Sequence, residues 1–347
     1  MSSNNPETKY FLLKKSKVKD LLNTLYKEFE IFVPVEEEGM VNFKRYKLNN
    51  NFNMEFTNTL LPPKGLFLPQ QETLFTINYK KEELIEENLE TSRRIIFGIR
   101  PCDSRSLTIL DEVFKEKSED VYYLQKRNNT LLIGLGCSNP QIYCFCSSLE
   151  VDPGKDSSVD IFLTDLGEKY LVTANTKEGQ QLIKDLPVYF EKAGEEEITR
   201  ALEIQSQARE GFSVGFAKKD TEIFRDVEII FEHPIWEELA ETCLGCGICT
   251  YLCSTCHCFD IADELAKNEG RRFRCWDSCQ FFSFTNMTSG HNPRPNRKER
   301  IRQRFLHKLS YFVSRYGSIA CVGCGRCLRN CPVDIDITRV IGAINHE

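Results

Sequence analysis

Two segments of the chain each carry four cysteines in the spacing C-x2-C-x2-C-x3-C. The first reads CLGCGICTYLC from residue 243, and the second reads CVGCGRCLRNCP from residue 321. Three thiolates spaced in this way on one tight loop can bind three corners of an iron–sulfur cube, because the intervening glycines let the backbone curl around it. The fourth cysteine begins a helix that points away, and in folds with two clusters it binds the other cube. The two segments therefore predict two 4Fe–4S clusters.

Each predicted ligand set takes three cysteines from one segment and the fourth from the other segment. The first cluster is expected to be bound by Cys243, Cys246, Cys249 and Cys331. The second cluster is expected to be bound by Cys321, Cys324, Cys327 and Cys253. Because each set supplies four thiolates, no iron keeps an open position, so both clusters should pass electrons rather than bind a substrate.

Eight further cysteines bring the total to 16, and the N-terminus shows no secretory signal. We therefore expect a cytoplasmic protein whose thiols bind metal, since the cytosol does not favour structural disulfides. Four of the eight precede the two segments: Cys102, Cys137, Cys144 and Cys146. They are predicted to bind a third 4Fe–4S cluster, with a zinc site or buried thiols without metal as the alternatives.

The last four cysteines lie between the two segments. They are Cys256, Cys258, Cys275 and Cys279. Four groups of four would use all 16 cysteines, so a fourth cluster is the hypothesis for this group. The competing interpretations are a zinc site with His257 as a further ligand, and thiols that pack around the two ferredoxin-like segments.

A long cysteine-free stretch divides the chain and places a domain boundary near residue 234. Residues 1–234 are predicted to form a mixed α/β domain and residues 235–347 a helical ferredoxin-like domain, so the fold class is α+β. Cys102 and Cys137 each follow a short apolar segment typical of a buried strand. Because ligands in open α/β sheets bind at that end of the strands, these cysteines should lie close together.

The remaining elements follow from the spacing of apolar residues. Periodicity predicts helices at residues 16–29, 81–89, 104–114, 176–186, 196–210, 260–268 and 297–316. Buried strands are expected at residues 94–99 and 130–135, and a hairpin at residues 159–164 and 169–174. Asp260 is the expected N-cap of the helix at 260–268.

Basic residues gather between residues 271 and 308. We expect Arg272, Arg274, Arg294 and Arg297 to compensate the negative charge of the clusters. A solvated helix face and a nucleic-acid site are the alternatives, although the net charge of −6 does not favour nucleic-acid binding.

Composition and missing motifs exclude several other classes of protein. No apolar stretch approaches the roughly 20 residues that a membrane span needs. The apolar share of 41% is enough to form a core, so global disorder is not expected. The sequence contains no glycine-rich dinucleotide fingerprint, no phosphate-binding P-loop and no HExxH zinc motif, so no flavin or nicotinamide site is evident.

The cysteine segments resemble a known family. Residues 243–260, the WDSC sequence ending at Cys279, and residues 321–336 are similar to the 4Fe–4S dicluster subunits of cytoplasmic anaerobic reductases. That family includes the dicluster subunits of anaerobic sulfite reductases and the beta subunits of sulfhydrogenases. The RPCD sequence at Cys102 and the CFC sequence at Cys144 extend the resemblance over most of the chain, whereas Cys275 departs from the family pattern.

The resemblance implies a non-catalytic electron-transfer role within a larger complex. A flavoprotein partner would take a hydride from NAD(P)H, and this chain would carry single electrons to a catalytic partner. The catalytic partner would hold siroheme for sulfite, or nickel and iron in a hydrogenase or sulfur reductase. A self-contained reductase, whose N-terminal cluster keeps an open iron, and a zinc-dependent scaffold are the competing functions.

Overall fold

The computed structural model describes residues 10–78, 80, 83–86 and 89–345. Its N-terminal part is built on one eight-stranded sheet in the order β10-β1-β9-β8-β7-β6-β2-β3. In that order the strands are β10 (Glu191–Lys192), β1 (Tyr10–Lys14), β9 (Lys169–Ala174), β8 (Ile161–Asp165), β7 (Thr130–Leu135), β6 (Arg94–Ile99), β2 (Glu30–Glu37) and β3 (Met40–Arg45). The four strands β2, β6, β7 and β8 run parallel, and the outer strands pair antiparallel. The predicted strands at 94–99 and 130–135 are therefore confirmed as central neighbours.

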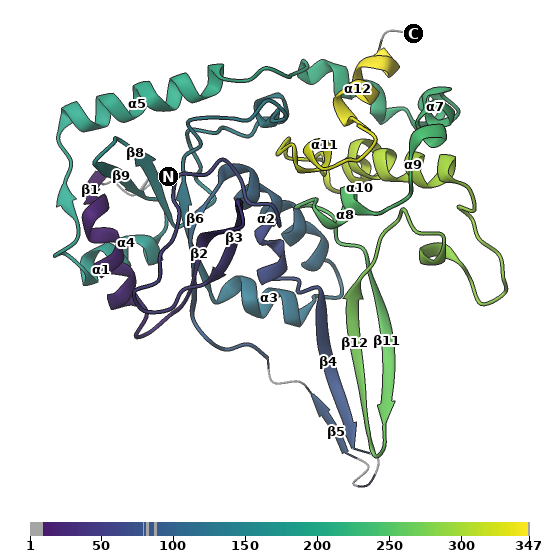
Figure 1. Ribbon diagram of the computed structural model, residues 1–347, viewed down its shortest axis with the longest axis horizontal. Coiled ribbons are helices and arrows are strands. Elements are labelled where there is room, and N and C mark those ends of the chain that lie inside the picture. The colour runs from purple at the N-terminus through teal and green to yellow at the C-terminus, as the bar shows by residue number, and fades with distance from the viewer. Residues whose placement is uncertain (1–9, 79, 81–82, 87–88, 346–347) are drawn as a thin grey trace, which may run out of the picture.

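Helices cover both faces of this sheet because its central strands are apolar on both sides (Figure 1). On one face, Ile95 and Phe97 pack with α1 (Lys15–Leu25) and α4 (Lys177–Asp185). On the other face, Ile96 packs with α2 (Pro101–Phe114) and α3 (Val121–Asn128). The longest helix, α5 (Glu195–Glu210), lies against β8 and β9. The expected helices at 16–29, 104–114, 176–186 and 196–210 and the hairpin of β8 and β9 are confirmed, with shifts of a few residues at their ends.

A second sheet forms an arm that projects from the body of the molecule (Figure 1). Its antiparallel order is β11-β12-β4-β5. The strands are β4 (Gln71–Asn78), β5 (Glu83–Glu86), β11 (Phe259–Ala266) and β12 (Glu269–Trp276). The prediction of a helix at 260–268 was therefore wrong, because β11 pairs along its whole length with β12, and β12 pairs with β4 from the N-terminal part. Such cross-strand pairing outweighs a weak local helix preference.

The predicted helix at 81–89 was also wrong where the chain is described. Glu83–Glu86 forms strand β5, which pairs with β4. Residues 81–82 and 87–88 lie outside the described residues.

Helices build the core of the C-terminal part. They are α6 (Val227–Phe231), α7 (Ile235–Thr242), α8 (Ile248–Tyr251), α9 (Arg297–Leu306), α10 (Phe312–Tyr316), α11 (Arg326–Arg329) and α12 (Ile337–Asn345). A π-helical turn, His307–Tyr311, joins α9 to α10. The predicted helix at 297–316 is therefore confirmed, with this turn in its middle. Its buried residues Ile301, Phe305 and Leu309 pack against Trp236 of α7. No described helix is both long and apolar enough to span a membrane.

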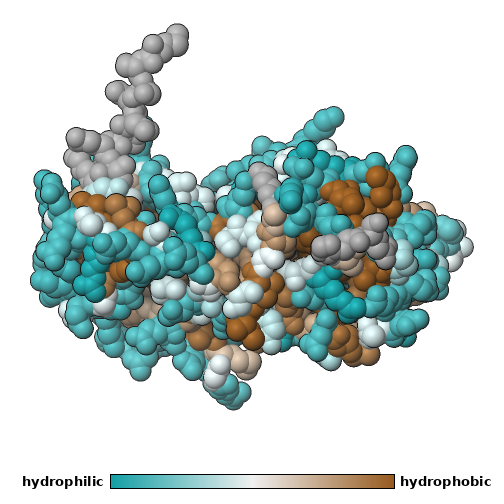
Figure 2. Space-filling model, turned by 90° about the horizontal axis from the view of Figure 1, so that it is seen from above, coloured by the Kyte–Doolittle hydropathy of each residue, from teal (hydrophilic) through white to brown (hydrophobic). Residues whose placement is uncertain are grey.

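This core also takes in residues from before position 234. Phe145, Phe224 and Ile230 pack among the side chains of α7, α9 and α12. Figure 2 shows larger hydrophobic areas over this half of the molecule than over the half that holds the eight-stranded sheet. The N-terminal and C-terminal parts of the chain therefore pack together in one shared core. A domain boundary at residue 234 remains a prediction.

Candidate functional site

The first cysteine group surrounds a small enclosed cavity. Its lining includes Cys243, Cys246 and Cys249 from the first segment and Cys331 from the second. The loop curls through Gly247, whose φ of +77° lies in the left-handed region and where a Cβ atom would come within 2.8 Å of the Phe281 ring. The structure thus brings together the four cysteines that the spacing predicts for the first cluster.

The second cysteine group joins Cys253 to the other segment. Burial raises the pKa of Cys321 to about 12, and the neighbouring thiols of Cys327 and Cys253 add to the rise. Burial also raises the pKa of Cys327 to about 12, with Cys253 and Cys324 among its neighbours. These four cysteines are the set predicted for the second cluster, and the structure places them side by side.

The N-terminal cysteines also converge. Burial raises the pKa of the Cys146 thiol, and the neighbouring thiols of Cys137, Cys144 and Cys324 raise it further. The partly buried Cys102, at the start of α2, has Cys324 and Cys146 among its neighbours. This arrangement agrees with the prediction that Cys102, after β6, and Cys137, after β7, lie close together at one edge of the sheet.

The loop that carries Cys144 and Cys146 packs directly on the second ferredoxin-like segment. The backbone N–H of Phe145 donates to the carbonyl of Gly323 at 2.9 Å. A Cβ atom on Gly323 would lie only 2.5 Å from the backbone of Cys146, so a glycine is needed for this approach. The Asn58 amide donates to the carbonyl of Cys324 at 2.7 Å. The N-terminal group and the second group are therefore in contact through the backbone.

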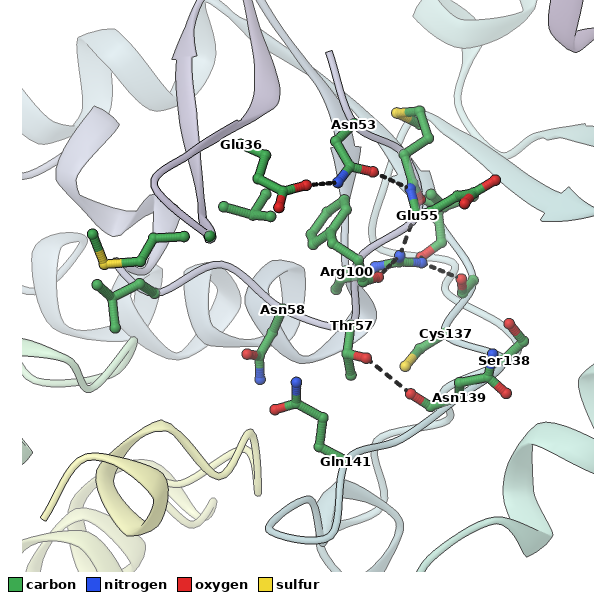
Figure 3. Close-up of a pocket in the computed structure, with 18 of the residues that line it drawn as sticks. Glu36, Asn53, Glu55, Thr57, Asn58, Arg100, Cys137, Ser138, Asn139 and Gln141 are labelled. Atoms are coloured by element: carbon green, nitrogen blue, oxygen red, sulfur yellow. Dashed lines mark hydrogen bonds between the residues drawn. The ribbon is translucent and has the colours of Figure 1, made fainter.

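A polar cavity of about 870 Å³ reaches Cys137 at the carboxyl ends of the parallel strands (Figure 3). Its wall includes Asn58, Glu36 and Asn139. Arg100 is buried there, and its guanidinium donates to the backbone carbonyls of Phe56 and Gly136. The N-terminal cysteine group thus has a cation beside it and an open polar cavity along one side.

The remaining four cysteines are less closely assembled. The thiols of Cys258 and Cys279 are close neighbours of each other, whereas the thiol of Cys256 lies beside that of Cys253 in the second group. Cys275 lies on β12, opposite Asp260 of β11. The structure therefore places Cys256 against the second group and does not gather the predicted four around a single point.

Several buried cations near the cysteines were not predicted. Lys64, Arg304 and Lys308 are all buried, and among the described residues no carboxylate lies within 4 Å of any of their charged nitrogens. Lys64 donates to the carbonyl of Cys256 at 2.8 Å and lies over the Trp276 ring. One signal in the sequence could have revealed two of them: Arg304 and Lys308 are one helical turn apart among the apolar residues of α9 and its continuation.

Two of the arginines chosen from the sequence have other partners. Arg272 pairs with Asp263, and the buried Arg274 pairs with Glu72 and Asp120. The prediction that Arg272 and Arg274 compensate the charge of the clusters was therefore wrong. Carboxylates of the arm, and Asp120 at the N-cap of α3, already neutralise these two side chains. Arg297 does lie at the site, where it donates to the carbonyl of Cys243 at 2.8 Å.

The donor set fits iron–sulfur clusters. Burial raises the pKa of the Cys249 thiol to about 11, so without metal this thiol would be protonated and neutral. The buried Arg304 beside it would then lack a negative partner there, whereas a metal-bound thiolate would supply one. Among the described residues, no three His, Cys, Asp or Glu side chains are close enough to hold a single metal ion.

Comparison with known proteins supports this assignment. The 4Fe–4S dicluster domain family matches residues 242–335, which contain both cysteine segments. Sulfhydrogenase 2 subunit beta of Pyrococcus furiosus is 31% identical over 326 residues, which cover 94% of this chain and 95% of that protein. The N-terminal α/β part is therefore shared as well as the dicluster domain. The chain belongs to the family of 4Fe–4S dicluster proteins that includes sulfhydrogenase beta subunits, and it is an iron–sulfur electron-transfer subunit with two 4Fe–4S clusters.

Proposed function

We propose that this chain relays single electrons between a flavoprotein partner that uses NAD(P)H and a catalytic partner in the same complex. The observation that carries the proposal is the closeness of each cysteine group to the next. The N-terminal group touches the second group at Gly323, and Cys327 of the second group has Cys249 of the first among its neighbours. The N-terminal group, the second group and the first group therefore follow one another, and we call this order the row of cysteine groups.

The ligand sets of the relay are those of the three cysteine groups. The first cluster takes Cys243, Cys246, Cys249 and Cys331, and the second takes Cys321, Cys324, Cys327 and Cys253. A third takes Cys102, Cys137, Cys144 and Cys146. Such clusters, when bound, accept and release one electron at a time. The α/β part, residues 1–234, would hold the third, and residues 235–347 the first two.

The protein's own residues keep these groups close and partly desolvated. Gly323 allows the backbone of one loop to rest on the other, and buried cations lie beside the thiols. Cys246 is exposed at one end of the row, and the cavity reaches Cys137 at the other. Electrons would therefore have two places of access, one at Cys246 and one at Cys137.

A hydrogenase or sulfur reductase with nickel and iron is the preferred catalytic partner. The relative that aligns over nearly the whole chain is a sulfhydrogenase subunit. A siroheme sulfite reductase is the second candidate, and it rests only on the resemblance of the cysteine segments. A self-contained reductase would require that one N-terminal cysteine not bind iron, so that substrate addition to the isolated chain would shift its spectrum.

The direct test is the content of iron, sulfide and zinc in protein purified without oxygen, with its co-purifying partners identified. We expect about 12 irons for three clusters of four, no zinc, and a flavoprotein together with a nickel–iron protein. About 16 irons would indicate that Cys256, Cys258, Cys275 and Cys279 hold a fourth cluster. About 8 irons would contradict the N-terminal cluster, and a siroheme companion would favour the sulfite reductase.

Replacing Gly323 by alanine should disturb the contact between the N-terminal and second groups. The left-handed backbone alone should cost about 1–2 kcal/mol of unfolding free energy. Overlap of the new methyl group with Cys146 should add about 1–3 kcal/mol. We also expect weaker magnetic coupling between the two reduced clusters, measured by electron paramagnetic resonance.

Gly317 provides a matched control for this substitution. Its φ is +74°, close to the +62° of Gly323, but a Cβ atom there would meet nothing within 4 Å. Gly317→Ala should therefore show only the backbone cost and normal coupling. Equal effects of the two substitutions would contradict a close contact at Gly323.

A further inference from the structure

Lys308 lies between the two cysteine segments in the π-helical turn that joins α9 to α10. Its side chain is only 4% exposed, and the two residues that follow it, Leu309 and Ser310, are also buried. A π-helical turn holds more residues than an α-helical turn, and such turns are frequent at functional sites. The turn thus directs an uninterrupted set of side chains, with a lysine among them, into the protein.

The Lys308 ammonium group has three acceptors. Its Nζ lies 3.2 Å from Cys253 Sγ, 3.1 Å from Thr255 Oγ1 and 3.2 Å from the carbonyl oxygen of Ala320. The Thr255 hydroxyl donates to that same carbonyl at 2.7 Å, so its proton is engaged there. Lys308 therefore donates to the Thr255 hydroxyl, and with Cys253 and Ala320 as the other acceptors all three of its N–H groups are used.

Only one of these acceptors can carry a negative charge. A hydroxyl and a backbone carbonyl are neutral, and none of the three acceptors that the described residues offer to Lys308 Nζ is a carboxylate. A buried ammonium without a negative partner is strongly unfavourable. Among the three acceptors, the thiolate of Cys253 is the group that can balance it.

The same three contacts connect the two halves of the proposed ligand set. Cys253 ends the first segment and Thr255 follows it closely, whereas Ala320 immediately precedes Cys321 of the second. We propose that Lys308 is a positioning residue that holds Cys253 beside the second segment and raises the reduction potential of the second cluster. This inference rests on the proposed ligand set for that cluster. A positive charge and an N–H donor at a ligand sulfur favour the reduced, more negative state.

Two substitutions separate charge from hydrogen bonding. Lys308→Gln can keep an N–H donor without the charge, and Lys308→Met removes both while filling similar space. Lys298→Met is the matched control, since Lys298 lies on the same helix but its Nζ is 3.1 Å from Glu237. The full chain, purified without oxygen, would be assayed for iron and then titrated with dithionite under electron paramagnetic resonance.

We expect the potential of the second cluster to decrease in the order wild type, Lys308→Gln, Lys308→Met. The other clusters and the Lys298→Met variant should keep wild-type potentials and iron content. Unchanged potentials in both Lys308 variants at full iron content would overturn the inference. Loss of the cluster from both variants would overturn the inferred effect on the potential, because the lysine would then be needed for binding of the cluster itself. If instead Cys253→Ala keeps all the iron, the proposed ligand set fails independently of Lys308.

Discussion

The Cys331→Ala variant is expected to lose the same cluster as Cys246→Ala, although these cysteines belong to different segments. Both residues line one enclosed cavity, together with Cys243 and Cys249. Each variant should contain about four fewer irons per chain than the wild type, since a cube with one ligand missing is not retained. Because cluster binding is coupled to folding, the C-terminal core should also become less stable. Iron analysis and electron paramagnetic resonance of the reduced variants would measure both the amount and the identity of the lost signal.

The reciprocal pair completes this test. Cys253→Ala and Cys324→Ala should both remove the second signal and keep the first. Leu244→Ala is the control, because this exposed residue lies inside the first loop but carries no thiol. If Cys331→Ala removed the same signal as Cys324→Ala, each segment would bind its own cube and the exchanged ligand sets would be wrong.

The second large effect is expected at the ion pair between Asp103 and Arg326, which joins the two parts of the protein. Both side chains are fully buried, and the guanidinium donates to the two carboxylate oxygens at 2.6 and 2.8 Å. The remaining donors of Arg326 reach the carbonyl and hydroxyl of Thr59. Asp103→Asn would leave a buried cation without its counter-ion, which should cost about 3–5 kcal/mol of unfolding free energy. Denaturant unfolding of the iron-loaded chain would measure the loss.

A double variant identifies the cause of that loss. Asp103→Ala combined with Arg326→Met removes both charges, so it should be more stable than Asp103→Asn alone. The exposed pair of Glu116 and Arg315 is the control, since Glu116→Gln should change stability little. A double variant no more stable than Asp103→Asn would show that packing, and not an unpaired charge, causes the effect.

The sequence was sufficient for features that depend on residues close together in the chain. The two cysteine segments specify their loops because three ligands and the glycines between them lie within a few residues. The central strands β6 and β7 were also recognisable, because strands buried on both faces are apolar without interruption. Cys102 and Cys137 could then be placed together from the general behaviour of open α/β sheets.

The tertiary structure decided features that depend on distant partners. The segment at β11 was predicted as a helix, but its pairing through β12 reaches β4, which comes from the N-terminal part of the chain. The role of Lys308 was hidden for the same reason, since its three acceptors come from two other segments.

The contact at Gly323 is the clearest example of this division. Its glycine was read from the sequence as part of a cluster loop, yet the close approach of the Cys146 backbone could not be foreseen. Local spacing determines which thiols can bind a cluster, because a ligand loop is a short-range structure. The row of cysteine groups and the cations beside them are set by packing between segments far apart in sequence, which no local pattern encodes.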